Sequence, residues 1–189
     1  MFHTLNPNLI LGYHGCDASV GEGLLNGAQF TPSENDYDWL GPGIYFWESN
    51  PQRALSFATE QMDRGRINKP FVVGAVLSLG KCIDTMSEDS ILAIEQAHKI
   101  LLETLERSGE VPPRNGGGSD LLLRRLDCAV MRTLHGIAVE ARTPIDSVRG
   151  LYHEGDRLYD NSGFYRKSHV QIAICNPECI KGIFRVSNV

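Results

Sequence analysis

Residues 41–58, GPGIYFWESNPQRALSFA, carry the clearest fold pattern in this chain. Their first part, residues 43–48, is β-branched and aromatic, which is typical of a strand. Ser49 or Asn50 then offers the side chain of a helix N-cap, and Pro51 suits a first helical turn. Apolar residues recur at helical spacing after that cap, at Ala54, Leu55, Phe57 and Ala58. The stretch therefore predicts a strand that leads directly into an amphipathic helix.

Further strands are predicted on both sides of this stretch. The segments of alternating or continuous apolar residues are 8–14, 71–79, 147–152, 169–175 and 180–186. We expect residues 71–79 to form a central, buried strand. Residues 19–26 predict a short helix, with Ser19 as its N-cap and Glu22 three residues later. Strands and helices mixed in this way indicate an α+β fold.

The middle of the chain has a different pattern. Residues 88–108 have apolar side chains at helical spacing and are followed by Gly109. Residues 120–134 also have apolar side chains at helical spacing. Between them, residues 110–119 contain two prolines and three consecutive glycines, which is typical of a flexible connector. We therefore expect a helical hairpin at about residues 87–136, inserted into a single domain that spans residues 1–189. The simplest role for such an insertion is packing.

Composition excludes several classes of protein. The chain has 189 residues, of which 42% are hydrophobic and 22% charged, values close to those of globular proteins and unlike those of disordered or fibrous chains. No apolar run reaches the roughly 18 residues that cross a bilayer. The first ten residues, MFHTLNPNLI, do not resemble a secretory signal. We expect a cytoplasmic protein with no membrane partner.

The cysteines point away from a metal site and from disulfides. The chain has an odd number of cysteines, five, and only Cys175 and Cys179 are close together. A structural zinc site needs a second close pair or two histidines, and neither is present at a suitable spacing. We therefore expect reduced thiols and no metal.

Three residues on predicted strands have side chains suited to chemistry. His14 ends the first strand, next to Gly15, which lets a planar ligand approach the backbone. Tyr45 alternates with Ile44 and Phe46, so its ring faces the other side of the strand, where it could stack on a flat heterocycle. Gln171 interrupts an apolar strand, and a buried amide needs hydrogen-bond partners.

The order and spacing of these residues resemble the ADP-ribosyltransferase superfamily, in its diphtheria-toxin and poly(ADP-ribose) polymerase-like branch. That branch has a His-Tyr-Glu signature on three strands, which falls here on His14, Tyr45 and Gln171. The resemblance covers GYHGC, GPGIYFWESNPQRALSFA and HVQIAICNPECI, at both ends of the chain. It implies a split antiparallel β-sheet and NAD as co-substrate. The helical insertion has no counterpart in it.

The resemblance also implies roles for individual residues. His14 would bind a ribose hydroxyl of NAD, and the backbone of Gly15 would bind the nicotinamide carboxamide. Tyr45 would stack on the nicotinamide ring, with Phe57 as the second ring. Residues expected to recognise the target lie in the loop before the last catalytic strand: Phe164, Tyr165, Arg166 and Lys167.

This sequence departs from the family signature at two positions. Gln171 replaces the usual glutamate, and an amide stabilises developing positive charge less well than a carboxylate. Cys16 stands where a serine or threonine would contact the nicotinamide. Acidic residues that could compensate are Glu48, Glu154 and Asp156. We also expect Arg149 to meet an NAD phosphate.

The resemblance implies a mono-ADP-ribosyltransferase that modifies RNA, DNA or protein, in the manner of a toxin from a toxin–antitoxin or phage-defence system, with an antitoxin as a further partner. One alternative is a degenerate module that binds NAD or ADP-ribose without catalysis. A second alternative is an RNA 2′-phosphotransferase-like enzyme, for which the chain offers Arg142, Arg149 and Arg166.

Overall fold

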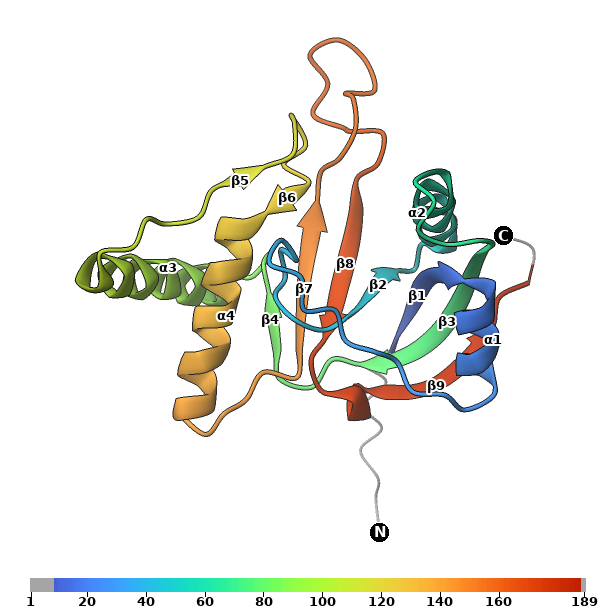
Figure 1. Ribbon diagram of the computed structural model, residues 1–189, viewed down its shortest axis with the longest axis horizontal. Coiled ribbons are helices and arrows are strands. Elements are labelled where there is room, and N and C mark those ends of the chain that lie inside the picture. Colours follow the sequence, from blue (N-terminus) through green and yellow to red (C-terminus); the bar gives the residue numbers. More distant parts are fainter. Residues whose placement is uncertain (1–8, 188–189) are drawn as a thin grey trace.

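Seven strands form one curved sheet, and four α-helices pack around it (Figure 1). The computed structural model describes residues 9–187. Along the sheet the strand order is β4-β7-β8-β2-β1-β3-β9. The strands are β1 Leu9–Asp17, β2 Ile44–Glu48, β3 Pro70–Ser78, β4 Cys82–Asp84, β7 Ser147–Tyr152, β8 His169–Ile174 and β9 Ile180–Arg185. The α+β class expected from the sequence is confirmed.

Neighbouring strands of the sheet run antiparallel, except that β4 pairs with β7 in parallel. The predicted strands are present, but β4 was not predicted, because a three-residue segment shows no periodicity. The expectation that residues 71–79 form a central strand was wrong. That segment is β3, next to the edge strand β9, whereas β8, β2 and β1 occupy the middle. Asn8, the first residue of the predicted strand 8–14, lies outside the described residues, as do residues 1–7.

Helices α1 and α2 pack against strands β1 and β3 of the sheet. Helix α1, Ala18–Leu25, is capped by Asp17, whose carboxylate accepts from the Ser19 backbone, so the expected Ser19 cap lies two residues too late. Helix α2, Pro51–Asp63, begins as predicted: the Asn50 side chain accepts from the Arg53 backbone, and Pro51 occupies the first turn. Capping of this kind satisfies backbone groups that a helix end leaves free.

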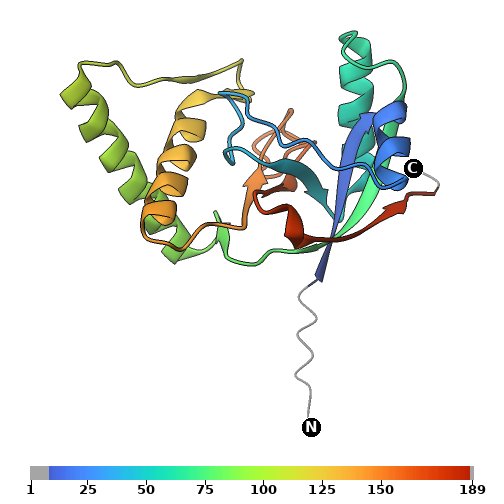
Figure 2. The same ribbon diagram turned by 60° about the horizontal axis from the view of Figure 1, so that its bottom comes forward.

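The helical insertion lies beside the other end of the sheet (Figure 2). Helix α3 is Glu88–Ser108, and its end at Gly109 has the left-handed conformation that glycine adopts without strain. Helix α4 is Arg125–Glu140, five residues later than predicted at its start. Instead of helix, the preceding segment contributes strand β6, Leu123–Arg124, which pairs with β5, Asn115–Gly116.

The core lies on both faces of the sheet. One cluster joins the segment before β2 to helix α4 and strands β7 and β8, through Trp39, Leu40, Val130, Met131, Leu134, Val148 and Ala173. A second cluster, on the opposite face, contains Ile44, Phe46, Ala75, Leu77, Ile172 and Ile174. The alternation of β2 therefore buries Ile44 and Phe46 on one face and turns Tyr45 to the other, as predicted.

Candidate functional site

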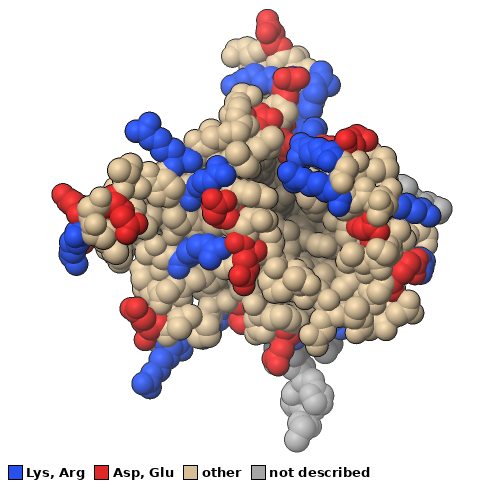
Figure 3. Space-filling view, viewed as in Figure 1, with Lys and Arg blue, Asp and Glu red and all other residues tan. Residues whose placement is uncertain are grey.

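A cleft of about 810 Å³ opens beside β1, β2 and β8, which are neighbours in the sheet. In Figure 3 it is the shaded hollow at the centre of the visible face, with Lys and Arg side chains at its upper rim. His14, Tyr45 and Gln171 all line this cleft, one from each of the three neighbouring strands. The structure thus brings together three residues that the sequence places up to 157 positions apart.

His14 presents a hydrogen-bond acceptor. Its Nδ1 lies 2.8 Å from the backbone carbonyl oxygen of Tyr45, which only accepts, so Nδ1 carries the proton. Burial lowers the pKa of His14, against the opposing effect of that hydrogen bond. The imidazole is therefore neutral at pH 7, and Nε2 keeps a lone pair that can accept from a hydroxyl or an N–H group.

Tyr45 contributes its ring, because its hydroxyl is already occupied. The hydroxyl donates to the Gly41 carbonyl at 2.8 Å and accepts from the Leu40 backbone N–H at 3.1 Å. Burial raises the pKa of Tyr45 well above its usual value, and the charge of Asp38 adds to the effect. A phenol in this state does not exchange protons near neutral pH, but its ring is held rigidly against the cleft.

Gln171 is bound by a residue from the long segment before β2. The Trp39 indole Nε1 donates to the Gln171 side-chain oxygen at 2.6 Å. Because that oxygen is engaged, the amide turns its two N–H donors toward other partners. The site thus offers an acceptor at His14 and donors at Gln171.

Aromatic rings form much of the cleft wall. Phe57 lines the cleft from helix α2 and packs against Trp47 with ring centroids 4.8 Å apart. Trp47 lies in register between Tyr13 on β1 and Gln171 on β8. Further rings that line the cleft are those of Trp39 and Tyr152, which meet edge to face at 5.2 Å. Such a wall suits flat, apolar ligand groups.

A cluster of four charged side chains lines one part of the cleft. Arg53 Nη2 lies 2.6 Å from Glu154 Oε2, and both side chains are only 9% exposed. Lys167 bridges Glu60 at 3.0 Å and Glu154 at 3.4 Å. Burial by itself raises the pKa of Glu154, but the hydrogen bond and charge of Arg53 and the charge of Lys167 outweigh it, and the pKa is lowered. Glu154 is therefore an ionised partner of Arg53 and cannot donate a proton.

Four buried polar atoms near that pair have no hydrogen-bond partner among residues 9–187: Trp47 Nε1, Arg53 Nε, Arg53 Nη1 and His169 Nε2. All three residues line the cleft. The His169 Nδ1 lies 2.6 Å from the Lys167 carbonyl, which makes Nε2 an acceptor in the neutral ring. An unpaired polar atom inside a protein costs about 1–3 kcal/mol.

Gly15 has a packing role in addition to the backbone contact expected of it. A side chain at Gly15 would meet the Ala54 carbonyl oxygen at 2.2 Å, so the glycine lets helix α2 approach β1 closely. Gly15 still lines the cleft through its backbone. Cys16 does not line it, and burial together with the charge of Asp17 raises the pKa of Cys16 to about 11, so it is an unreactive thiol.

Arg149 was also placed wrongly by the sequence. It does not line the cleft, and its guanidinium binds Glu48 at 2.9 Å through Nη2 and Asp84 at 2.9 Å through Nη1. Tyr152, three residues later on β7, does line the cleft, so the alternation of the strand turns Arg149 to the other face. Glu48 is committed to this ion pair and cannot assist chemistry in the cleft. Asp156 does not line the cleft either.

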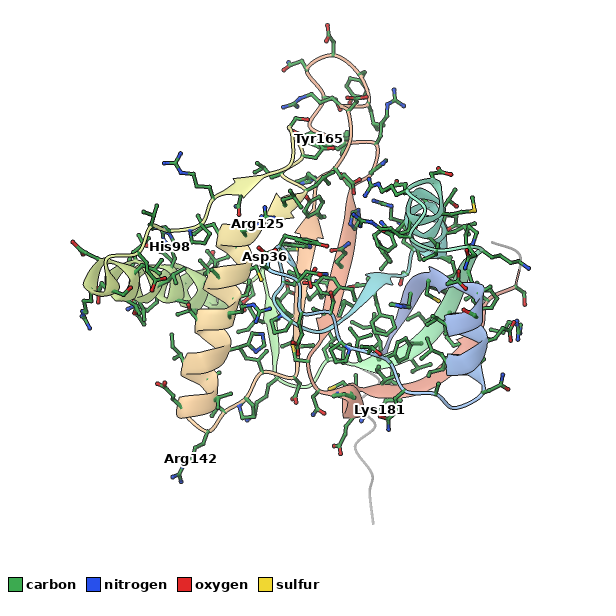
Figure 4. The ribbon with its side chains drawn as sticks, viewed as in Figure 1. Asp36, His98, Arg125, Arg142, Tyr165 and Lys181 are labelled. Atoms are coloured by element: carbon green, nitrogen blue, oxygen red, sulfur yellow. The ribbon has the colours of Figure 1, made fainter. Side chains whose placement is uncertain are left out.

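The loop 153–168 projects beyond the sheet (Figure 1), and its residues Glu154 and Lys167 line the cleft. Its Phe164 is 66% exposed, and the Tyr165 ring lies 5.2 Å from that of His153, on the projecting loop (Figure 4). Of the four residues expected to recognise a target, only Lys167 lines the cleft, and Arg166 and the two aromatic residues lie beyond it. Arg142, at the far end of α4 in Figure 4, is not near the cleft.

Several cleft residues were missed by the sequence reasoning. Trp47 follows Tyr45 by two positions, and His169 precedes Gln171 by two, so strand alternation alone could have found both. Arg53 belongs to a stripe on α2 that lines the cleft at helical spacing: Arg53, Phe57, Glu60, Gln61 and Arg64. Trp39 comes from an irregular segment and had no signal in the sequence.

Two features are absent from residues 9–187. No group of three or more His, Cys, Asp or Glu side chains there could hold a metal ion. No helix in that part of the chain is both long and apolar enough to cross a membrane.

Comparison with known proteins adds little to this geometry. No family model matches the chain, and no solved structure matches it. An uncharacterized protein of Methanocaldococcus jannaschii is 33% identical over 61 residues. That match covers 32% of this chain and 28% of the relative, so the matched part is a little over a quarter of the relative's length.

Proposed function

We propose that this protein is a mono-ADP-ribosyltransferase that moves ADP-ribose from NAD to a macromolecule. One observation carries the proposal: His14, Tyr45 and Gln171, chosen from the sequence by family resemblance, line a single cleft from the adjacent strands β1, β2 and β8. The largely antiparallel sheet is compatible with the split-sheet fold that the resemblance implies.

The size and the lining of the cleft support the binding of NAD. Its volume of about 810 Å³ falls within the range of about 300–1,000 Å³ usual for small-molecule sites. We assign the Tyr45 ring to stacking on nicotinamide, with Phe57 and Trp47 as neighbouring aromatic surfaces. The neutral His14 accepts a hydrogen bond from a ribose hydroxyl, and the Gln171 amide donates to one.

Positive side chains around the cleft suit the diphosphate of NAD. The basic residues in its lining are Arg53, Arg64, Arg66, Arg124 and Lys167. Arg53 and Lys167 are paired with acids, whereas Arg64 and Arg66 stand at the exposed end of α2. Arginine binds phosphate oxygens in a bidentate manner. Because Arg53 and Arg124 are paired with Glu154 and Asp127, Arg64 and Arg66 are the better candidates for binding the diphosphate.

The chemistry divides between NAD and this chain. NAD supplies the ADP-ribosyl group, whose bond to nicotinamide breaks as a nucleophile of the target attaches to the same carbon. The chain holds the ring at Tyr45 and orients the ribose at His14 and Gln171. Since Gln171 is neutral and Glu154 is paired with Arg53, the cleft has no free carboxylate at these two positions to stabilise positive charge. We therefore expect slow transfer that relies on the nucleophilicity of the target.

We assign target recognition to the loop 153–168, which bears the exposed Phe164 and the basic Arg166 and Lys167. Aromatic and basic side chains together suit a nucleic acid or an acidic protein surface. The role of a toxin in a toxin–antitoxin or phage-defence system, with an antitoxin as partner, follows from the family resemblance alone.

Labelled NAD and a cell lysate test the proposal directly. The wild-type protein should attach label to RNA, DNA or protein, and Tyr45→Ala should abolish it. Arg107→Ala serves as the control, because this α3 side chain is 80% exposed. Equal labelling by wild type and Tyr45→Ala would contradict the proposal.

A second function is favoured by the hydrogen bond between Trp39 and Gln171. Because the glutamate of the signature is replaced by an amide whose oxygen is engaged, the chain could bind NAD or ADP-ribose without transferring anything. Calorimetry separates the two functions: NAD binding without labelling of any target identifies a binding module. The phosphotransferase alternative has no such support, since none of Arg142, Arg149 and Arg166 lines the cleft.

A further inference from the structure

We propose that Trp39 is the positioning residue for Gln171, and that helix α4 of the insertion holds Trp39 in place. This inference rests on the proposed function, in which Gln171 contacts NAD. It gives the insertion a role in the site, beyond the packing role expected from the sequence.

The first step is the contact itself. Trp39 Nε1 lies 2.6 Å from Gln171 Oε1, and an indole N–H can only donate. The bond therefore selects one of the two orientations of the amide, with the oxygen toward Trp39 and the nitrogen toward the cleft. Without this donor, the amide could turn over and present its oxygen instead.

The second step is the rigidity of the donor. Trp39 is 9% exposed, and its ring packs against that of Tyr152, at 5.2 Å, and against the guanidinium of Arg124, at 4.7 Å. Gly150 makes the room for it, since a side chain there would lie 2.5 Å from the Trp39 ring. Gly150 is also the partner of Gln171 in the register of β7 and β8. The glycine thus places the indole directly beside the strand that carries the amide.

The third step is the attachment of the segment that carries Trp39. Three contacts fasten residues 34–36 to α4: Arg125 Nε to Asp36 Oδ2 at 2.8 Å, Arg132 Nη2 to the Glu34 carbonyl at 2.9 Å, and Cys128 Sγ to the Asn35 carbonyl at 3.4 Å. Figure 4 shows Asp36 and Arg125 next to each other at the start of α4. Trp39 and Leu40 then pack in the core beside Val130, Met131 and Leu134 of α4.

Together these contacts connect the insertion to the cleft. A displacement of α4 would move residues 34–40, and with them the donor that orients Gln171. The same segment supplies Leu40 and Gly41, which bind the Tyr45 hydroxyl. Two of the three signature side chains are therefore held by a segment that α4 supports.

The hydrogen bond can be observed directly by NMR of the two indole N–H groups, assigned with Trp39→Phe and Trp47→Phe. In the full chain, Gln171→Leu should shift the Trp39 indole resonance upfield, because its acceptor is lost. This shift should exceed that of the Trp47 resonance, since Trp47 is the register partner of Gln171 but makes no hydrogen bond to it. An unchanged Trp39 resonance would overturn the proposal.

Binding of NAD, measured by calorimetry, tests the positioning role. Trp39→Phe should weaken binding about fivefold in the wild-type background, the usual effect of one lost hydrogen bond. In the Gln171→Leu background it should have little further effect, since the amide to be oriented is gone. Equal effects in the two backgrounds would show that Trp39 acts on NAD binding independently of Gln171 and would reject the positioning role.

The support from α4 needs a variant with a matched control. Arg125→Ala combined with Arg132→Ala should shift the Trp39 resonance and weaken NAD binding about threefold. Lys99→Ala combined with Arg107→Ala removes the same charge from exposed positions of α3 and should change neither. Identical behaviour of the two pairs would refute the role of α4. If wild type binds no NAD, the proposed function fails, whereas the NMR result still decides whether Trp39 orients Gln171.

Discussion

His14 and Tyr45, 31 residues apart, are joined by a hydrogen bond of 2.8 Å from the imidazole Nδ1 to the tyrosine backbone carbonyl. The bond crosses between the neighbouring strands β1 and β2, so two residues chosen as ligand contacts also fix one another. It leaves His14 Nε2 free as an acceptor, and this polarity determines which ligand atoms the cleft can take. A hydroxyl fits this position better than a phosphate oxygen does.

Protonation of His14 should therefore weaken both folding and binding. Burial lowers the pKa of His14 below its ordinary value of 6.5, so the unfolded chain binds the proton more readily than the folded one. The free energy of unfolding should fall as the pH drops from about 6.5 through the folded-state pKa. His135 and His169, whose pKa values burial also lowers, contribute in the same sense. Denaturation between pH 8 and pH 5 measures the slope, and His14→Gln should reduce it.

The hydroxyl of Tyr45 should contribute mainly to stability, and its ring mainly to the binding of NAD. Tyr45→Phe removes the hydrogen bonds to Leu40 and Gly41 and should cost about 1 kcal/mol of stability. Because it keeps the ring, it should weaken NAD binding much less than Tyr45→Ala does. Calorimetry and chemical denaturation of both variants provide the comparison. Equal losses of binding would mean that the hydroxyl, not the ring, contacts the ligand.

Replacing Gln171 by glutamate should increase transfer. The new carboxylate can accept from the Trp39 indole and still direct negative charge toward the cleft, where the reaction builds positive charge. We expect labelling of the target to rise about tenfold or more, with Gln171→Leu as the control that removes the polar group. A glutamate variant no faster than wild type would show that the site has lost catalysis by other changes as well.

The pair Arg53–Glu154 should contribute strongly to stability, because both partners are buried. Glu154→Ala leaves the Arg53 charge without its closest partner, and such a change typically costs about 3–5 kcal/mol. Glu103→Ala breaks an exposed pair on α3 and should cost no more than about 0.5 kcal/mol. Urea denaturation of both variants makes the comparison. Similar small losses would indicate that water reaches Arg53 in solution.

Gly150→Ala should displace Trp39, which lines the cleft and packs against Gly150 of β7. The added methyl group would lie 2.5 Å from the Trp39 ring and 2.9 Å from Leu40 Cδ2. Overpacking of this kind costs about 1–3 kcal/mol. Gly182→Ala, on β9, meets nothing within 4 Å and is the matched control. If both substitutions leave the unfolding midpoint unchanged, Trp39 is less tightly packed than the structure indicates.

The sequence by itself determined the local elements. The strand β2 and helix α2 follow from residues 43–58, since strand alternation, an Asn cap and a proline in the first turn act over a few neighbouring residues. The same locality gave helix α3 its end at Gly109. The choice of His14, Tyr45 and Gln171 came from the resemblance to the ADP-ribosyltransferase superfamily, which rests on short stretches around each of these residues.

Only the tertiary structure decided what these residues touch. Alternation tells which residues of a strand share a face, but not which face borders a cleft, and so it could not show that Arg149 binds Glu48 and Asp84 outside the cleft. The bonds from Trp39 to Gln171 and from Arg53 to Glu154 span 132 and 101 residues, distances over which no sequence periodicity carries information. Such contacts depend on how the whole sheet curves and how α4 packs against it, because a side chain's partners are set by the packing of distant segments.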